Sequence, residues 1–218
     1  MKKLLIALFV LSCTSAMTQK ASRFKKANSY YKHLSYVNAS KIYEELIGSK
    51  FDTPILKERL AMCYYRMGEM QRAEKYFSQF TTDKELDKHW YYFYAQTLKQ
   101  NGKYAESDVW MTKFHDVFPS DSRGLSYFND KDYLLNIQKR GKKYTIQNLA
   151  VNSPYADFGG YFSVNNDVLF ISARKKSSSV YREWMWNGKP FLNLYLAQKD
   201  SIYELNNPKY LNRKIKVC

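Results

Sequence analysis

The chain has 218 residues, a formal net charge of +15 at neutral pH, 45% hydrophobic residues and 17% aromatic residues. This length allows one or two domains with buried cores, and the composition excludes an intrinsically disordered chain. Such a basic chain suggests anionic partners, and nucleic acid would come first for an intracellular protein. A solvated basic face without a dedicated ligand explains the charge equally well.

The segment 1–18 has the three parts of a secretory signal peptide. Lys2 and Lys3 form the positive start, residues 4–11 the apolar run and residues 12–18 the small-residue cleavage zone. The apolar run is shorter than the roughly 20 residues of a membrane span. We therefore expect an exported protein of the periplasm or outer-membrane surface, without a transmembrane helix and without nucleic-acid partners. A buried amphipathic first helix is the alternative.

The cysteines allow a second form of processing. Cleavage fits near Ala16 or Thr18, but VLSC also matches a lipobox imperfectly, in which case Cys13 would be lipidated. Cys63 lies in a helical aromatic stretch, where a free cysteine is usually a small core residue. Cys63 and Cys218 are too few and too distant to indicate a disulfide framework.

A repeat with a constant offset of 34 runs through residues 19–119, since 61 − 27 and 95 − 61 are both 34. The equivalent positions are Ala27, Ala61 and Ala95; Tyr30, Tyr64 and Leu98; Leu34, Gly68 and Gly102; Tyr36, Met70 and Tyr104; Ala39, Ala73 and Ser107; Tyr43, Phe77 and Met111; Leu46, Phe80 and Phe114. Pro119 closes the last unit. Seven positions in register over three units, without a gap, indicate a true repeat.

This period and pattern resemble the tetratricopeptide repeat, whose unit is a pair of antiparallel helices. The resemblance implies that the small residues lie where the helices cross and that Gly68 and Gly102 form tight turns. Leu34 replaces glycine in the first unit, which predicts a looser turn there. Three units are about the minimum for a stable stack.

The resemblance also implies a binding surface. Tetratricopeptide units bind peptides or partner helices along the concave face formed by the first helix of each unit. The groove-facing positions expected here are Asn28, Tyr31, Lys32, Met62, Tyr65, Arg66, Gln96 and Lys99. We expect Lys32, Arg66 and Lys99 to line up on neighbouring helices, which favours an acidic segment as ligand. A groove covered by another part of the same chain, or simply solvated, is the alternative.

The pattern changes after the repeats. Residues 120–142 are expected to form turns and a short capping helix over 129–141, with Gly141 as its stop. From residue 143 the apolar period is two, which predicts strands at 144–151, 160–164, 167–173 and 191–197. A hairpin turn is expected at 165–167. The predicted fold class is therefore α+β, with a domain boundary near residue 142.

Within residues 143–218, the stretches 152–175 and 186–198 resemble the opening blade of a WD-type β-propeller, with FISAR at 170–174 as its motif. The expected architecture is thus an all-α tetratricopeptide-repeat superhelix followed by an incomplete antiparallel β-propeller blade. A propeller has typically 4–8 blades, and this chain has room for about one. We therefore expect a truncated or deliberately short product.

The order of these segments resembles the N-terminal part of the OmpA-family envelope proteins of Bacteroidetes, over residues 1–206. The resemblance implies a periplasmic adaptor with PorP/SprF-like outer-membrane or secretion-system partners, associated in some relatives with type IX secretion and gliding. In intact relatives a C-terminal OmpA-like domain binds peptidoglycan. That domain is absent from this sequence, so its binding residues have no counterpart here.

No residue pattern in the sequence indicates catalysis, a cofactor or a metal. His33, His89 and His115 lack ligand spacing, and the serines at 177–179 lack a G-x-S-x-G context. We therefore expect a non-enzymatic protein without a cofactor. Two alternatives stay open: the N-terminal fragment of a propeller-bearing hydrolase or peptidase, and a stand-alone tetratricopeptide interaction protein.

Overall fold

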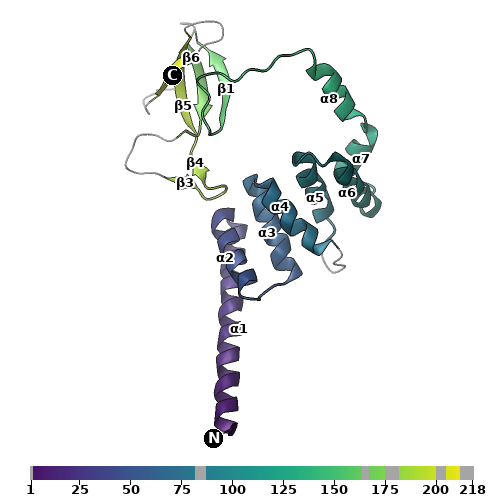
Figure 1. Cartoon of the computed structure of the whole chain (residues 1–218), viewed down its shortest axis with the longest axis vertical. Helices are drawn as coiled ribbons and strands as arrows, with labels where there is room; N and C mark the ends of the chain where they lie inside the picture. Colours follow the sequence, from purple (N-terminus) through teal and green to yellow (C-terminus); the bar gives the residue numbers. More distant parts are fainter. Residues whose placement is uncertain (1, 82–86, 164–166, 175–181, 200–204, 212–218) are drawn as a thin grey trace. The chain divides into compact units, whose positions relative to one another are not determined.

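The computed structural model describes residues 2–81, 87–163, 167–174, 182–199 and 205–211 (Figure 1). The chain divides into two units. The first comprises Met1–Asp132 together with Met185–Asn187, and the second Tyr133–Trp184 together with Gly188–Cys218. We refer to them as the helical unit and the sheet unit.

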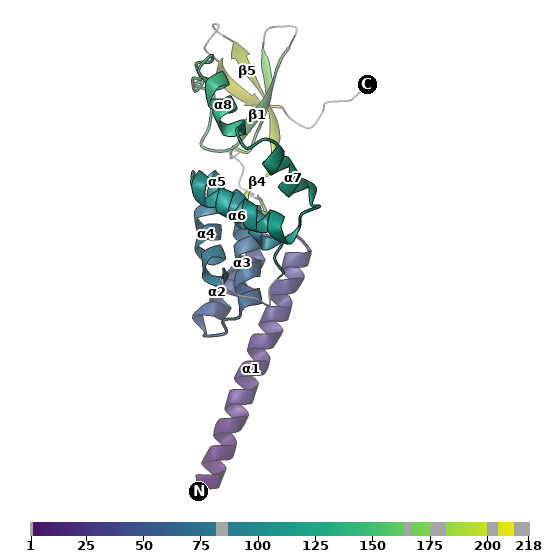
Figure 2. The same cartoon turned by 90° about the vertical axis from the view of Figure 1, so that its right-hand side faces the viewer.

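The helical unit consists of helices that pack in sequence order. They are α1 (Lys2–Lys32), α2 (Tyr36–Gly48), α3 (Pro54–Met67), α4 (Met70–Phe77) with the short 3-10 helix η1 (Ser78–Phe80), α5 (Trp90–Gln100), α6 (Tyr104–Val117) and α7 (Ser122–Asn129). Helix α1 packs on α2, α3 on α4 and α5 on α6, and α2·α3 and α4·α5 contacts join these pairs (Figures 1 and 2). Over the described residues, the repeat period thus corresponds to stacked helical hairpins, a tetratricopeptide-like arrangement.

The turn inside each hairpin has the same backbone hydrogen bonds three times. The N–H groups of Leu34, Gly68 and Gly102 donate to the carbonyls of Tyr31, Tyr65 and Lys99 at 3.1 Å, and those of Ser35, Glu69 and Lys103 donate to Tyr30, Tyr64 and Leu98 at 2.9 Å. All three turn residues are left-handed, with φ of 59° at Leu34, 82° at Gly68 and 79° at Gly102. The expected looser first turn is therefore wrong: Leu34 adopts the glycine conformation because the hydrogen bonds of the turn require it.

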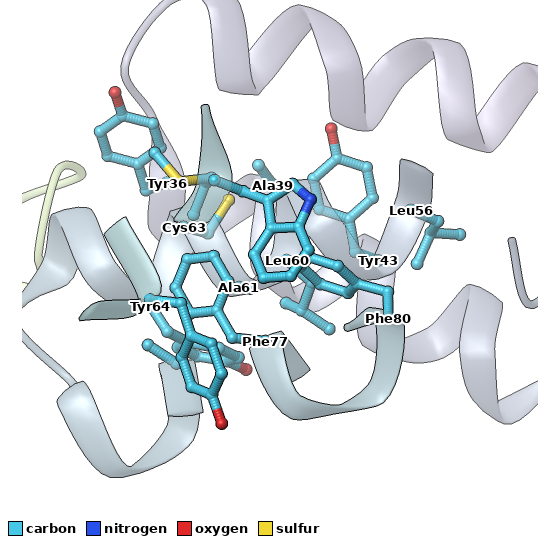
Figure 3. Close-up of a cluster of buried hydrophobic side chains, with 14 of the residues drawn as sticks. Tyr36, Ala39, Tyr43, Leu56, Leu60, Ala61, Cys63, Tyr64, Phe77 and Phe80 are labelled. Carbon is cyan, nitrogen blue, oxygen red and sulfur yellow. The ribbon is translucent and has the colours of Figure 1, made fainter. Parts of the chain in front are cut away.

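The small residues of the repeat are buried between the helices. Ala27, Ala39, Ala61, Ala73 and Ala95 are 0% exposed. Ser107 takes the alanine position in the last hairpin, and its hydroxyl donates to the carbonyl of Ala95 at 2.8 Å. Burial at these positions agrees with the expected helix crossings. Aromatic and aliphatic side chains from α2, α3, α4 and η1 surround Ala39 and Ala61 (Figure 3).

Local capping signals explain where two of the helices begin. Thr53 caps α3, since its hydroxyl accepts a hydrogen bond from the N–H of Leu56 and Pro54 occupies the first turn. Asp121 caps α7 by accepting from the N–H of Arg123 at 2.9 Å. Helix α7 is an addition to the sequence prediction, which expected turn and cap residues at 120–124 and a helix only from residue 129.

Within the described ranges, the sheet unit contains α8 (Tyr133–Gly141) and six strands: β1 (Asp157–Phe162), β2 (Val168–Ser172), β3 (Glu183–Trp184), β4 (Lys189–Pro190), β5 (Asn193–Lys199) and β6 (Leu205–Tyr210). A four-stranded antiparallel sheet has the order β1-β2-β5-β6, and β3 pairs with β4. The sequence placed the domain boundary near residue 142, at the end of α8, whereas the two units divide between Asp132 and Tyr133, before α8. The propeller interpretation of this single sheet stays a prediction.

The strand predictions had different outcomes. The strands expected at 167–173 and 191–197 correspond to β2 and β5, and the one at 160–164 overlaps only the end of β1. The expected strand at 144–151 is wrong, because that segment forms no strand and exposes Tyr144 (74%) and Ile146 (92%). The predicted turn at 165–167 lies largely outside the described residues.

One face of the sheet is closed by apolar packing and a polar network. Val151, Phe170, Tyr195 and Ala197 form its buried cluster. The Arg174 guanidinium donates to Asp157 Oδ1 at 2.9 Å and to the carbonyl of Val151 at 2.7 Å. The FISAR stretch therefore ends in an arginine that fixes β2 to the segment preceding β1.

The N-terminal helix α1 runs through the predicted cleavage zone at residues 12–18. A cleaved leader and a permanent first helix both adopt helical backbone, so the export signal stays a prediction. Among the helices of the described ranges, none has the length and apolar character needed to cross a membrane.

Candidate partner-binding surface

The eight predicted groove residues lie on the first helix of each hairpin: three on α1, three on α3 and two on α5. They occupy three repeat positions, which we number from the shared alanine of each hairpin. The first position after the alanine holds Asn28, Met62 and Gln96; the fourth holds Tyr31, Tyr65 and Lys99; the fifth holds Lys32 and Arg66.

The first position faces the interior of the stack. The side-chain oxygen of Asn28 accepts a hydrogen bond from the buried Tyr43 hydroxyl at 2.6 Å. Met62 is only 7% exposed and belongs to the core. The amide nitrogen of Gln96 lies 3.9 Å from the sulfur of Met111. These three side chains contact their own fold, so their surface for a partner is small.

The fourth position forms a half-buried aromatic row on α1 and α3. The Tyr31 ring meets Tyr36 edge-on, with centroids 5.5 Å apart, and Tyr65 meets Phe93 edge-on at 5.3 Å. Burial raises the pKa of Tyr31 to about 12. Its hydroxyl therefore remains a protonated hydrogen-bond donor at neutral pH.

The fifth position presents cations. Lys32 and Arg66 are exposed and occupy equivalent places in the last turns of α1 and α3, since 66 − 32 equals the repeat offset of 34. We call this pair the cation row. The Arg66 guanidinium lies 5.5 Å from the Phe93 ring centroid and 6.0 Å from that of Tyr65. Cations in a last helical turn also stabilise the helix through its dipole, with or without a ligand.

Lys99 stands apart from this pair. Its offset from Arg66 is 33 (99 − 66), one less than the repeat offset, so it occupies the repeat position of Tyr65. A step of one position rotates a side chain by about 100° around a helix. The structure thus places Lys32 and Arg66 at equivalent repeat positions. Lys99 also lies in a last helical turn, that of α5, but at the fourth repeat position, which is aromatic on α1 and α3.

Sequence reasoning missed one further contact on this unit. Met185–Asn187 belongs to the helical unit. The Trp186 ring meets the buried Tyr36 ring edge-on at 5.0 Å, and its indole N–H donates to the carbonyl of Arg66 at 2.7 Å. The Asn187-Gly188 pair is a turn signal that could have predicted the local bend. No local signal identifies Tyr36, far earlier in the chain, as the neighbour of Trp186.

The structure also bears on the two candidate cysteines and on metal binding. Cys63 is a buried free thiol in α3, and burial raises its pKa, which keeps it in the unreactive neutral form. The side chain of Cys13 lies outside the described part of the chain. Among the described side chains, no group of three or more His, Cys, Asp or Glu is arranged to hold a metal ion.

The likeness of this chain to known proteins is weak. No protein-family model and no curated protein matches the chain. A similar solved structure is the C-terminal part of a TPR repeat-containing protein from Cytophaga hutchinsonii, with 23% identity and a TM-score of 0.42. The match covers 57% of this chain and only about half, 52%, of the other. We transfer no residue or role from it.

Proposed function

We propose that this chain is a non-enzymatic adaptor of the cell envelope that binds protein partners on the face formed by α1, α3 and α5. The observation that carries the proposal is the repeated helical hairpin, with its three equivalent turns and buried alanine crossings. Stacked hairpins offer extended surfaces that bind other chains through shape and charge and require no reactive group.

The chemistry of this face favours an acidic segment with apolar side chains. Carboxylates would pair with Lys32 and Arg66, and apolar groups would rest on the edges of Tyr65 and Phe93. The Arg66 guanidinium already lies over the Phe93 ring. An arginine held in this way loses less side-chain entropy when it binds a carboxylate.

The cellular setting is the finer part of the proposal. The signal-like segment 1–18 supports export, and the resemblance in segment order to OmpA-family envelope proteins supports the periplasmic side of the outer membrane. In that setting the partners are PorP/SprF-like or secretion-system proteins, as in relatives associated with type IX secretion and gliding. Intact relatives would add tethering to peptidoglycan through an OmpA-like domain.

Export is tested by mass spectrometry of the protein purified from cell envelopes. We expect the first residue to follow position 16 or 18, or to be a lipidated Cys13. A mature protein that retains Met1 and fractionates with the cytoplasm would contradict the envelope location. That result bears on the location alone, because binding is measured on the purified chain.

The binding face is tested by charge reversal. The triple variant Lys32→Glu, Arg66→Glu, Lys99→Glu is compared with Lys25→Glu, Lys41→Glu, Lys75→Glu, which changes the same charge at exposed positions elsewhere on the helical unit. Binding of a fluorescent peptide of alternating Glu and Leu is followed by anisotropy, with pull-down of envelope proteins as the second measurement.

We expect the groove variant to bind the peptide about tenfold more weakly, since each exposed charge pair contributes on the order of 0.2–1 kcal/mol. The control variant should change affinity by less than about half of that free energy. Lys99→Glu alone should have the smallest effect, because Lys99 lies outside the cation row. Equal affinity of the two triple variants for the peptide, with unchanged helicity, would refute the proposed binding face.

A further inference from the structure

The end of the helical unit where α2 begins and α3 ends has two backbone groups that meet one short segment. Val37 N–H donates to the carbonyl of Met185 at 3.1 Å, and the carbonyl of Arg66 accepts from the Trp186 indole at 2.7 Å. The Trp186 ring lies edge-on to Tyr36. We call the surface made by Tyr36, Val37 N–H and Arg66 C=O the Tyr36 notch.

The two backbone groups of the Tyr36 notch have no hydrogen-bond partner within their own helices. Val37 lies in the first turn of α2 and Arg66 in the last turn of α3, where N–H and C=O groups have no intrahelical partner. The Tyr36 ring is fixed by burial and by its edge-on contact with Tyr31. A donor, an acceptor and an aromatic wall are therefore held rigidly at one place.

This combination selects a particular ligand. The N–H of Val37 needs a peptide carbonyl, and the carbonyl of Arg66 needs a donor at the position of an indole nitrogen. Tryptophan is donor-only at its ring nitrogen, whereas phenylalanine has no donor there. The ligand chemistry is thus a turn whose tryptophan follows a residue with an accessible carbonyl, as Met185 and Trp186 provide.

We propose that the Tyr36 notch is a receptor for a tryptophan-bearing turn of a partner protein, and that Met185–Trp186 occupies it in cis as a pseudo-ligand. The proposal rests on and extends the proposed function, because the notch adjoins the cation row at Arg66. The cis segment Met185–Asn187, which belongs to the helical unit, is only three residues long. Such a small contact is suited to displacement by a partner that also binds the neighbouring face.

Competition sets the expected behaviour. A segment of the same chain is present at a high effective concentration, so a free ligand binds only the fraction of molecules whose notch is vacant. If that fraction is about one tenth, the apparent dissociation constant rises about tenfold. Removal of the Trp186 side chain should therefore strengthen binding of a tryptophan-bearing peptide in trans.

The probe is a fluorescein-labelled peptide with the sequence of residues 182–190, REWMWNGKP. It is titrated against the full chain as wild type, as Trp186→Ala and as Trp184→Ala, the neighbouring tryptophan being the matched control. We expect Trp186→Ala to bind the peptide at least about tenfold more tightly than the other two. A peptide with phenylalanine at the position of Trp186 should lose this binding.

The result that overturns the proposal is equal affinity of the peptide for wild type and Trp186→Ala, or equal binding of the phenylalanine peptide. Circular dichroism reports whether the variant retains its helices, and Trp186→Phe, which keeps a ring without the donor, gives the same comparison if Trp186→Ala unfolds. The peptide has a formal charge of +1 from Arg182, Glu183 and Lys189. Its net charge is positive and its binding is assessed by the exchange of tryptophan for phenylalanine, so failure here is distinct from failure of the acidic-peptide test.

Discussion

The helical unit and the sheet unit solve the problem of burying apolar surface in different ways. In the helical unit, the same small residue returns in each repeat, and Ala27, Ala61 and Ala95 are completely buried. In the sheet unit, one face is closed by the cluster of Val151, Phe170, Tyr195 and Ala197. On β1, the aromatic side chains of Phe158 and Tyr161 are exposed.

The difference shows where each unit is vulnerable. A stack of hairpins distributes its stability over many repeated crossings, so one crossing is a part of a large core. The described sheet has a small cluster and depends on the ion pair of Arg174 with Asp157, whose side chains are 15% and 9% exposed. A single polar change should therefore weaken the sheet more than a single change of similar size weakens the helices.

The largest effect is expected from Arg174→Met. Removing the guanidinium leaves the Asp157 carboxylate buried without its cation, which should destabilise the sheet unit by about 4 kcal/mol. Hydrogen exchange measured by mass spectrometry on peptides from β2 and β5 reports the opening of this unit separately from the helices. The exposed Arg182→Met is the control, and equal exchange in the two variants would show that the ion pair contributes little.

A somewhat smaller effect is expected from Ala61→Phe. The side chain at this helix crossing has no room to grow, so overpacking should lower the free energy of unfolding of the helical unit by about 3 kcal/mol. Thermal unfolding followed by circular dichroism in the helix band measures the loss. Ala105→Phe on the exposed face of α6 should be nearly neutral, and a matching loss there would argue against a tight crossing at Ala61.

Lowering the pH should decrease the free energy of unfolding of the sheet unit by about 2 kcal/mol. Burial alone would raise the pKa of Asp157, but hydrogen bonds from Ser172, Ser153 and Arg174 outweigh it and lower the pKa to about 2. Because this lies below the unfolded value of about 3.9, the stabilisation is complete above that value and is lost as pH falls toward 2. Exchange in β2 and β5 should accelerate over that window, and Asp157→Asn should remove the pH dependence.

The smallest effect concerns the first turn. Leu34 carries φ 59° where the other hairpins have glycine, and its side chain is exposed. Leu34→Gly should therefore stabilise the helical unit by about 0.5–1 kcal/mol, since glycine adopts this conformation without strain but is more flexible when unfolded. Gly68→Leu should lower the free energy of unfolding of the helical unit by a similar amount. A destabilising Leu34→Gly would mean that the leucine side chain contributes packing.

The helical hairpins were predictable from the sequence because their constraints recur locally. A small residue is required at each crossing and a left-handed residue in each turn, so both appear at fixed spacing. The strand expected at 144–151 failed because alternation describes a half-buried strand only when a neighbouring strand is available to pair. Tyr144 and Ile146 have the alternating pattern, yet both side chains are exposed.

The candidate surface was predictable only in part. Spacing placed Lys32 and Arg66 at equivalent positions, but it could not show that Asn28 and Met62 contact the core, because a shift of one residue changes the face of a helix. The contact of Trp186 with Tyr36 joins residues far apart in the chain. Such a contact leaves no periodic signal in a single sequence.

The most direct test of the stacked-hairpin account measures the solvent access of its three alanines. Ala27→Cys, Ala61→Cys and Ala95→Cys are labelled with a maleimide under native conditions, with exposed Ala105→Cys as the reference and peptide mapping to separate the native cysteines. We predict that the three buried thiols react more than about a hundredfold more slowly than the reference, because they become accessible only when the unit opens. Labelling of all three at the reference rate would contradict the account.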